Sequence, residues 1–249
     1  MSCIFSVEGN IGSGKSTLVK MLKEYLIIAN DKKVVFLQEP VDEWESIKDE
    51  SGESILEKFY GNQQKYAFSF QMMAYISRIS LLKKTIRKNR DAVIITERSV
   101  YTDREVFAKM LYDDGKIETV NYNIYLKWFD EFTKDIHIDG IIYVHAEPLT
   151  SSSRVHKRGR QGENIPLQYL IKCHQYHENW LDKQNNVYVF DGNKEFEKLN
   201  DIMNEATDEI VVDNRFTHLL KHIVNEVRKK SITTIKPPDY DRILETFGC

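Results

Sequence analysis

An octapeptide close to the N-terminus, Gly9-Asn10-Ile11-Gly12-Ser13-Gly14-Lys15-Ser16, limits the folds open to this chain. Its spacing matches the phosphate-binding loop G-x-x-x-x-G-K-[ST], which lies between a buried strand and a helix. The apolar residues 4–7 predict that strand, and residues 17–26 have the apolar periodicity of a helix with one buried side. Because strand, loop and helix occur in the required order, we interpret the segment as a nucleotide polyphosphate site.

The residue types of this loop suit a polyphosphate ligand. Glycines let the backbone wrap around the phosphates, so that successive N–H groups point inward and the helix N-terminus adds partial positive charge. Lys15 is expected to reach the β- and γ-phosphates, and the Ser16 hydroxyl is expected to hold Mg²⁺. The predicted ATP contacts in this segment are Gly9, Asn10, Ile11, Gly12, Ser13, Gly14, Lys15, Ser16 and Thr17.

Composition narrows the class of protein. The chain has 249 residues and a formal net charge of −3, so it has no global basic field that would favour a nucleic-acid polymer. Cys3, Cys173 and Cys249 lie far apart and show no metal-ligand spacing or disulfide pattern. No apolar run approaches membrane-spanning length, and the first strand begins too early to leave room for a signal peptide. We expect a soluble, cytoplasmic protein that binds no membrane.

Short apolar runs alternate with helical stretches along most of the chain. This alternation predicts an α/β fold with a doubly wound, five-stranded parallel sheet and helices on both faces. In such sheets ligands bind beyond the carboxyl ends of the strands, which is where Glu39, Glu97 and Asp191 are expected. The predicted strands contain residues 4–7, 34–37, 93–95, 141–144 and 187–190.

The C-terminal part has a different pattern. Residues 216–227 predict an amphipathic helix, which we assign to a single domain over residues 1–229. Residues 230–249, which include Pro237-Pro238, are interpreted as a poorly ordered or docking tail.

Further segments, taken together, resemble the deoxynucleoside kinase family over roughly residues 3–196. They are residues 39–44 (EPVDEW), Phe70-Gln71 with Ser77-Arg78, residues 97–104 (ERSVYTDR) and residues 154–169 (RVHKRGRQGENIPLQY). The resemblance implies a P-loop NTPase-type fold with an arginine-rich lid at about residues 154–164. It also implies ATP-dependent phosphorylation of a deoxynucleoside 5′-hydroxyl to the monophosphate, a step of nucleotide salvage that requires Mg²⁺, in an enzyme that forms a homodimer.

The resemblance assigns the catalytic residues as Glu39, Arg98 and Lys15. Phosphoryl transfer to a sugar hydroxyl needs that hydroxyl oriented and its proton accepted, and Glu39 is expected to do this. Arg98 would lie near the reacting oxygen and phosphate, where a guanidinium stays charged and contacts several oxygens. Glu97 would join Ser16 near Mg²⁺.

Residues that would read the base come from three segments. The Gln71 amide carries a donor and an acceptor, so it can pair with an edge that offers N–H₂ beside a ring nitrogen, as cytosine and adenine do. By resemblance Phe70 and Phe107 flank the base, with an Arg78–Asp103 pair behind it. Family members with this pair prefer deoxycytidine or purine deoxynucleosides, whereas thymidine-accepting members have smaller or apolar residues there. The choice between cytosine and purines stays open, because Phe59 also shapes the pocket.

The sugar contacts follow from the resemblance alone. Trp44 would shape the sugar end of the pocket, and Tyr60 would contact the 3′-hydroxyl. Glu163 would contact the same hydroxyl, although Gln161 is the alternative because this part of the lid is shorter than in the family pattern.

The lid and the last strand complete the expected ATP site. Arg154 and Arg158 are four residues apart, so both can point from one helical face at a triphosphate, with Arg160 beyond the bend that Gly159 permits. Lys157 adds a further cation. By resemblance the loop of Asp191, Gly192 and Asn193 passes the base of the nucleotide donor.

Two other functions remain open for such a chain. A nucleoside monophosphate kinase would share the loop, sheet and lid, but it needs cations for the phosphate of its acceptor, and Glu39 would repel that phosphate. A catalytically inactive, kinase-like scaffold subunit is the other alternative, which the intact Lys15, Ser16 and Glu39 argue against. His145, His156, His174 and His177 show no metal-ligand spacing and are interpreted as structural or solvated.

Overall fold

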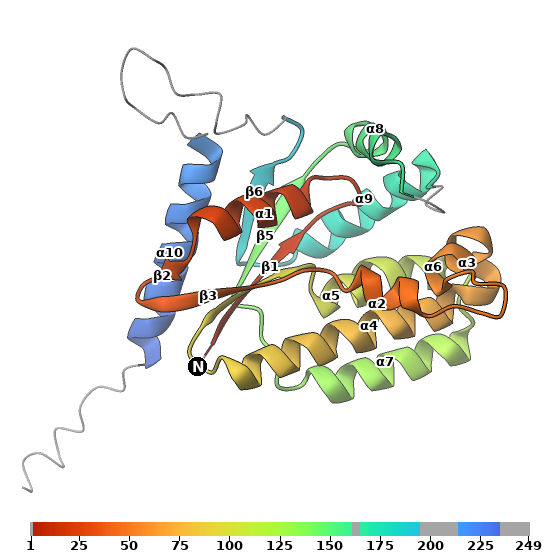
Figure 1. The fold of residues 1–249 in the computed structure, drawn as a ribbon, viewed down its shortest axis with the longest axis horizontal. Helices are drawn as coiled ribbons and strands as arrows, with labels where there is room; N and C mark the ends of the chain where they lie inside the picture. Colours follow the sequence, from red (N-terminus) through yellow and green to blue (C-terminus); the bar gives the residue numbers. More distant parts are fainter. Residues whose placement is uncertain (1, 161–164, 195–213, 235–249) are drawn as a thin grey trace, which may run out of the picture.

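The computed structural model describes residues 2–160, 165–194 and 214–234 (Figure 1). Its sheet has the strand order β2-β3-β4-β1-β5-β6, and the five strands β3, β4, β1, β5 and β6 are parallel, as predicted. The short β2 pairs antiparallel with β3 at one edge, which the sequence did not indicate. The strand bounds are β1 Cys3–Glu8, β2 Ile28–Ala29, β3 Lys32–Leu37, β4 Val93–Glu97, β5 Gly140–His145 and β6 Val187–Asp191.

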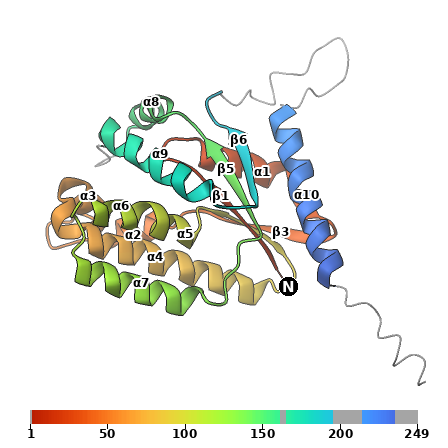
Figure 2. The same cartoon turned by 180° about the vertical axis from the view of Figure 1, so that it is seen from behind.

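Helices cover both faces of this sheet, as Figures 1 and 2 show from opposite sides. Helices α1 and α10 lie on one face, and α4 and α7 lie side by side on the other. The bounds are α1 Lys15–Tyr25, α2 Val41–Ser46, α3 Ile55–Gly61, α4 Gln63–Lys88, α5 Val100–Thr102, η1 Asp103–Ala108, α6 Lys109–Asp113, α7 Thr119–Thr133, α8 Pro148–Arg158, α9 Leu167–Leu181 and α10 Asn214–Thr234.

Strand β1 shows how alternating side chains build two cores. Phe5 and Val7 pack with α1 and α10, whereas Ile4 belongs to the core beneath α4 and α7. Successive residues of a strand point to opposite faces, so a strand buried on both faces must be apolar throughout. Burial on both sides fixes the sheet and the loops that follow its strands.

Residues 103–108 form a π-helical turn, η1, between α5 and α6. A turn of this kind widens the helix locally and is common at functional sites. Here it contains Asp103 and Phe107, both of which line the site described below. The sequence of this segment has no feature that distinguishes it from an ordinary helix.

Helix α10 continues to Thr234, five residues beyond the expected domain boundary at 229, and the boundary itself stays a prediction. Leu219, Ile223 and Val227 are buried against β1 and α1, consistent with the predicted apolar face. The remainder of the expected tail, 235–249, lies outside the described residues. Within the described ranges, no helix is both long enough and apolar enough to cross a bilayer.

Candidate active site

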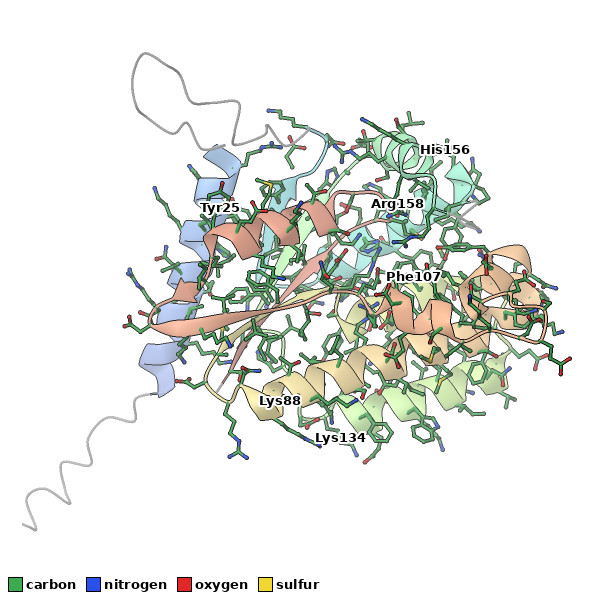
Figure 3. The ribbon with its side chains drawn as sticks, viewed as in Figure 1. Tyr25, Lys88, Phe107, Lys134, His156 and Arg158 are labelled. Atoms are coloured by element: carbon green, nitrogen blue, oxygen red, sulfur yellow. The ribbon has the colours of Figure 1, made fainter. Side chains whose placement is uncertain are left out.

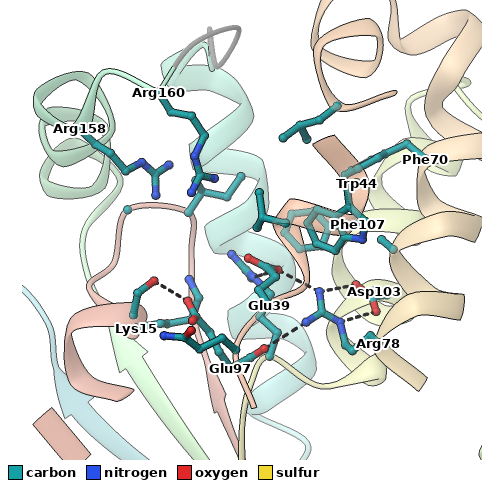
Figure 4. A pocket seen from close by; sticks show the side chains of 18 of the residues that line it. Lys15, Glu39, Trp44, Phe70, Arg78, Glu97, Asp103, Phe107, Arg158 and Arg160 are labelled. Atoms are coloured by element: carbon teal, nitrogen blue, oxygen red, sulfur yellow. Dashed lines mark hydrogen bonds and ion pairs between the residues drawn. The ribbon is translucent and has the colours of Figure 1, made fainter. Parts of the chain in front are cut away.

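A cavity of about 550 Å³ opens beyond the carboxyl ends of the parallel strands (Figure 4). The phosphate-binding loop and α8 line one side of it, and α2, α3, α4 and η1 line the other. In Figure 3, Arg158 and Phe107 approach it from these two sides. Among the predicted site residues, the cavity brings together Ile11, Gly12, Gly14, Lys15, Ser16, Thr17, Glu39, Trp44, Tyr60, Phe70, Gln71, Arg78, Glu97, Arg98, Asp103, Phe107, Arg154, Arg158 and Arg160.

The backbone of the loop has the conformation that its glycines allow. Gly12 has a φ of +81°, and a Cβ atom there would lie 2.4 Å from the Ser151 carbonyl oxygen of α8. Only glycine therefore permits this close packing of the loop against the lid helix. Asn10 ties the loop to α9, because its side-chain amide donates to the Leu170 carbonyl at 2.8 Å.

Lys15 is buried and its Nζ donates to the Asn10 carbonyl at 2.6 Å. Burial lowers the pKa of its ammonium to about 7, and the nearby charge of Arg98 acts in the same direction. The lysine is therefore close to losing its proton at neutral pH in the unliganded site. A polyphosphate beside it would favour the charged form.

Ser16 and Glu97 meet at the base of the loop, where the Ser16 hydroxyl donates to Glu97 Oε1 at 2.5 Å. A hydroxyl and a carboxylate are oxygen ligands of the kind that Mg²⁺ prefers, and octahedral coordination places neighbouring ligands about 2.9 Å apart. The two oxygens would therefore have to separate by about 0.4 Å, with loss of their hydrogen bond, to hold a Mg²⁺ ion together.

Glu39 contacts both Arg78 and Arg98, and Figure 4 shows its contact with Arg78. Its Oε1 is 2.9 Å from Arg78 and 3.2 Å from Arg98, while the side chain keeps 22% of its exposed surface. Burial favours the neutral acid, but Arg98 and then Arg78 outweigh it and lower the pKa of the carboxyl to about 2. Glu39 is thus a fixed carboxylate that faces the cavity.

Arg78 also holds Asp103, with Nε at 2.9 Å from Oδ2 and a second contact of 3.4 Å to Oδ1. Burial disfavours the charge of Arg78, yet Asp103 and Glu39 together raise the pKa of its guanidinium. Burial also raises the pKa of Asp103, against the attraction of Arg78 and with a further contribution from the charge of Glu39. The predicted base-reading pair is therefore linked directly to the predicted catalytic carboxylate.

Arg98 is held in an unusual backbone conformation, with a φ of +60°. A non-glycine residue in this region costs about 1–3 kcal/mol, which its surroundings must offset. Its backbone N–H donates to Val7 at 3.0 Å and its guanidinium donates to Gly9 at 2.9 Å. The guanidinium also lies 5.0 Å from the centre of the Phe107 ring.

Glu8 is a site-positioning residue that our sequence analysis missed. It is fully buried at the end of β1, where it accepts hydrogen bonds from the Ser99 backbone N–H at 2.9 Å and from the Thr102 hydroxyl. These contacts hold the turn that presents Glu97 and Arg98. The sequence feature that could have indicated Glu8 is its position: it is a charged residue at the end of an otherwise largely apolar strand, directly before the glycine-rich loop.

The far end of the cavity is aromatic. Phe70 stacks on Phe59 with ring centres 4.6 Å apart and meets Trp44 edge to face at 5.5 Å, while Trp44 Nε1 donates to Ser77 at 2.9 Å. Gln71 is 2% exposed, and its Oε1 has no hydrogen-bond partner among the described residues. A buried, unpartnered amide oxygen beside a cavity is costly unless a ligand satisfies it.

The lid helix α8 ends at Gly159, whose φ of +58° matches the predicted bend. Arg158 and Arg160 reach toward the cavity in Figure 4. Arg154 lines the cavity too, but its guanidinium donates to the carbonyls of Ser13 at 3.1 Å and Gly192 at 2.6 Å. It therefore joins the phosphate-binding loop to the loop after β6, in addition to its expected role toward phosphate.

Some predicted residues do not line the cavity. Asn193 contacts the backbone of Glu147, and Asp191 accepts from Asn193, so the loop 191–193 closes on itself and on Arg154. Gly9, Asn10 and Ser13 of the phosphate-binding loop are also not among the lining residues. Lys157 is exposed on α8 and is not among the lining residues. Glu163 and Gln161 lie outside the described residues.

Known proteins resemble this chain over most of its length. A family model described as "Deoxynucleoside kinase" matches residues 5–213. Deoxycytidine kinase of Homo sapiens is 39% identical over 197 residues, covering 71% of this chain and 74% of the relative. Deoxycytidine kinase 2 of Gallus gallus is 35% identical over 211 residues, with 76% and 78% covered. Mitochondrial deoxyguanosine kinase of Xenopus laevis is 32% identical over 208 residues, with 76% and 77% covered.

Proposed function

Because the chain belongs to the deoxynucleoside kinase family, we propose that it transfers the γ-phosphoryl group of ATP to the 5′-hydroxyl of deoxycytidine or a purine deoxynucleoside, and disfavours thymidine. The observation that carries the proposal is Gln71, which lines the cavity and whose buried Oε1 has no hydrogen-bond partner within the part of the chain that the structure describes. An exocyclic N–H₂ group of a base would satisfy this oxygen, and the amide N–H₂ would donate to the adjacent ring nitrogen.

The Arg78–Asp103 pair supports the exclusion of thymidine. Both side chains are buried and line the cavity next to Gln71, so they fill space beside the expected base plane. A C5-methyl group placed against them would desolvate two charges and gain no hydrogen bond. The deoxycytidine and deoxyguanosine kinases among the relatives are consistent with this preference.

Glu39 would orient the attacking hydroxyl as a hydrogen-bond acceptor. Its pKa of about 2 makes it a weak base at equilibrium, so proton transfer must follow rather than precede attack on phosphorus. A loose phosphoryl-transfer transition state suits this order, because the nucleophile stays protonated until the new P–O bond forms. Arg98 and Lys15 would stabilise charge on the transferring group, and Arg158 and Arg160 would close over it.

Mg²⁺ would be held by Ser16 and Glu97, and it supplies charge neutralisation of the phosphate oxygens. The sugar would lie between Trp44, Tyr60 and Glu39, all of which line the cavity. The assignment of the 3′-hydroxyl contact to Glu163 stays a prediction, as does the cytoplasmic location.

The alternative of a nucleoside monophosphate kinase is not favoured. Such an enzyme needs cations to hold the phosphate that its acceptor already carries. Here Arg78 and Arg98 both contact Glu39, so the nearest cations are neutralised by a carboxylate at the acceptor end. An inactive scaffold is also disfavoured, because Lys15, Ser16, Glu39 and Arg98 line one cavity.

A substrate panel tests this function. Initial rates with ATP and Mg²⁺ are measured on the four deoxynucleosides, the four ribonucleosides and dCMP. We expect turnover of deoxycytidine or a purine deoxynucleoside, a much lower kcat/KM for thymidine, and no transfer to dCMP. Preferred turnover of dCMP or of thymidine would contradict the proposal.

ATP binding is expected to be coupled to proton uptake by Lys15. Its pKa is lowered to about 7 in the unliganded site, so at about pH 8–9 most of the protein has a neutral lysine, and the ATP phosphates raise that pKa. Calorimetry in buffers of different ionisation enthalpy should give an uptake approaching one proton. Lys15→Arg is the matched control, because arginine stays charged and should show none. A wild type without uptake in this range would contradict the prediction.

We propose that the enzyme forms a homodimer through α4 and α7. Ile124, Trp128 and Phe132 are spaced four apart on α7, and each is at least 40% exposed, as is Ile76 on α4. A row of exposed apolar side chains is typical of an interface. Trp128→Glu should convert a dimer into a monomer in light scattering, whereas Ile27→Glu, outside this row, should not. A monomeric wild type would contradict the proposal.

A further inference from the structure

A cluster of two histidines and a glutamate lies away from the phosphoryl-transfer residues. His145 is the last residue of β5, and His174 and Glu178 are one helical turn apart on α9. One potential ligand atom from each lies within 4.8 Å of the others, and all three residues are partly buried. Sequence spacing gave no indication of this cluster, because β5 and α9 come together only in the fold (Figure 2).

We propose that His145, His174 and Glu178 bind a divalent transition metal of the Zn²⁺ class. Two imidazole nitrogens and one carboxylate oxygen form a common Zn²⁺ ligand set, with a water in the fourth position. Zn–N and Zn–O bonds of about 2.0–2.2 Å place tetrahedral ligands about 3.4 Å apart. His145 Nε2 and Glu178 Oε1 are already 3.8 Å apart, and the three ligand atoms all lie within 4.8 Å of one another, so side-chain rotation has to bring them closer when the metal binds. Mg²⁺ and Ca²⁺ prefer all-oxygen sites and fit this set poorly.

The surroundings of the cluster support a metal ligand role. The Tyr143 hydroxyl donates to Glu178 Oε1, which fixes the carboxylate as outer-shell partners do in metal sites. His174 Nδ1 is buried and has no hydrogen-bond partner among the described residues. A simple ion pair between His145 and Glu178 would leave this nitrogen unexplained.

The site is separate from Ser16 and Glu97, the predicted Mg²⁺ ligands. The His145 carbonyl accepts from the Gly192 N–H at 2.7 Å, and the lid helix α8 begins shortly after His145. A metal bound here would tie the end of β5, and so the base of the lid, to α9.

Full-length, metal-free protein titrated with Zn²⁺ alone tests the proposal. Calorimetry should give one equivalent, and Co²⁺ in its place should show the visible absorption of a tetrahedral complex. At a free Zn²⁺ concentration of about 100 Kd, the melting temperature should rise by about 5–10 °C. Excess Mg²⁺ should leave these results unchanged, because it does not compete for nitrogen ligands.

Variants locate the site. His145→Gln and Glu178→Gln should each weaken Zn²⁺ binding by more than about 100-fold, and Tyr143→Phe by about 10–100-fold, as outer-shell changes do. Glu178→Gln keeps an acceptor for Tyr143, so its metal-free melting temperature should stay close to that of wild type. His156→Gln is the control, since His156 is exposed on α8 (Figure 3).

Two results would overturn the proposal. The first is a wild type that binds no Zn²⁺, which would make the cluster a histidine–glutamate ion pair. The second is equal binding by wild type, His145→Gln and Glu178→Gln, which would place the metal elsewhere. Should either of these two variants fail to fold, the other still decides between the outcomes.

Discussion

Glu39→Gln is expected to lower kcat by about 100-fold or more while leaving nucleoside binding nearly unchanged. An amide keeps the shape of the side chain, but it cannot take up the proton that the 5′-hydroxyl releases, and general-base groups typically contribute about 10²–10⁴-fold. Steady-state rates and equilibrium binding of the nucleoside separate the two effects. Glu43→Gln, an exposed change on the adjacent α2, is the matched control and should keep wild-type turnover.

Glu39→Gln should also change how the free energy of unfolding depends on pH. The pKa of Glu39 is lowered from 4.5 to about 2, so its ionised form stabilises the folded state above about pH 4.5. That contribution is lost as pH falls from about 4.5 through about 2, and only below this range is the carboxyl protonated in both states. Unfolding curves should therefore differ between wild type and Glu39→Gln near neutral pH and converge as pH falls below about 2. Near wild-type turnover together with identical stability curves would remove Glu39 from the mechanism.

The sequence predicted the sheet well because its parallel strands are buried on both faces. Runs such as residues 93–95 and 141–144 are apolar throughout, which leaves few alternatives to a covered strand. Ile28–Ala29 escaped prediction because a two-residue edge strand has no periodicity to detect. The π-helical turn at residues 103–108 also has no local signature, since its residue types suit an ordinary helix.

The parts of the site that could not be predicted are contacts between residues that lie far apart in the sequence. The resemblance supplied Glu39 and the Arg78–Asp103 pair as separate parts of the site, but no sequence pattern indicates that Arg78 also contacts Glu39. Glu8 was missed for a related reason, because its partners Ser99 and Thr102 are about ninety residues away along the chain.

This double contact of Arg78 changes what is expected of Asp103→Ala. Removing one partner of a buried pair typically costs about 3–5 kcal/mol when the other charge is left uncompensated. Here Arg78 keeps Glu39 at 2.9 Å and the Glu97 carbonyl at 3.1 Å, so the loss of stability should be smaller. Chemical denaturation measures this loss. Asp103→Ala should also lower turnover on every nucleoside, because Arg78 is then free to draw Glu39 away from the hydroxyl.

Replacing both partners, Arg78→Met with Asp103→Ala, should change base preference. The change removes the two buried charges together and opens space for a C5-methyl group beside Gln71. A difference of one methyl-sized group between two substrates typically changes the ratio of their kcat/KM values by about 10–200-fold. The ratio of kcat/KM for thymidine to that for deoxycytidine should therefore rise by about that factor. Absolute rates should fall for all substrates, since Glu39 loses one of the two arginines that hold it.

The ratio rather than the rate is therefore the measurement that decides. Arg104→Met with Asp130→Ala, a surface ion pair of the same charge types at 3.4 Å, is the matched control and should leave the ranking of nucleosides unchanged. If the buried double variant folds with an unchanged ranking, the Arg78–Asp103 pair only supports the structure, and Gln71 reads the base without it. A wild-type enzyme that already prefers thymidine would contradict the assignment directly, because the charged pair would then leave room for the methyl group it is expected to exclude.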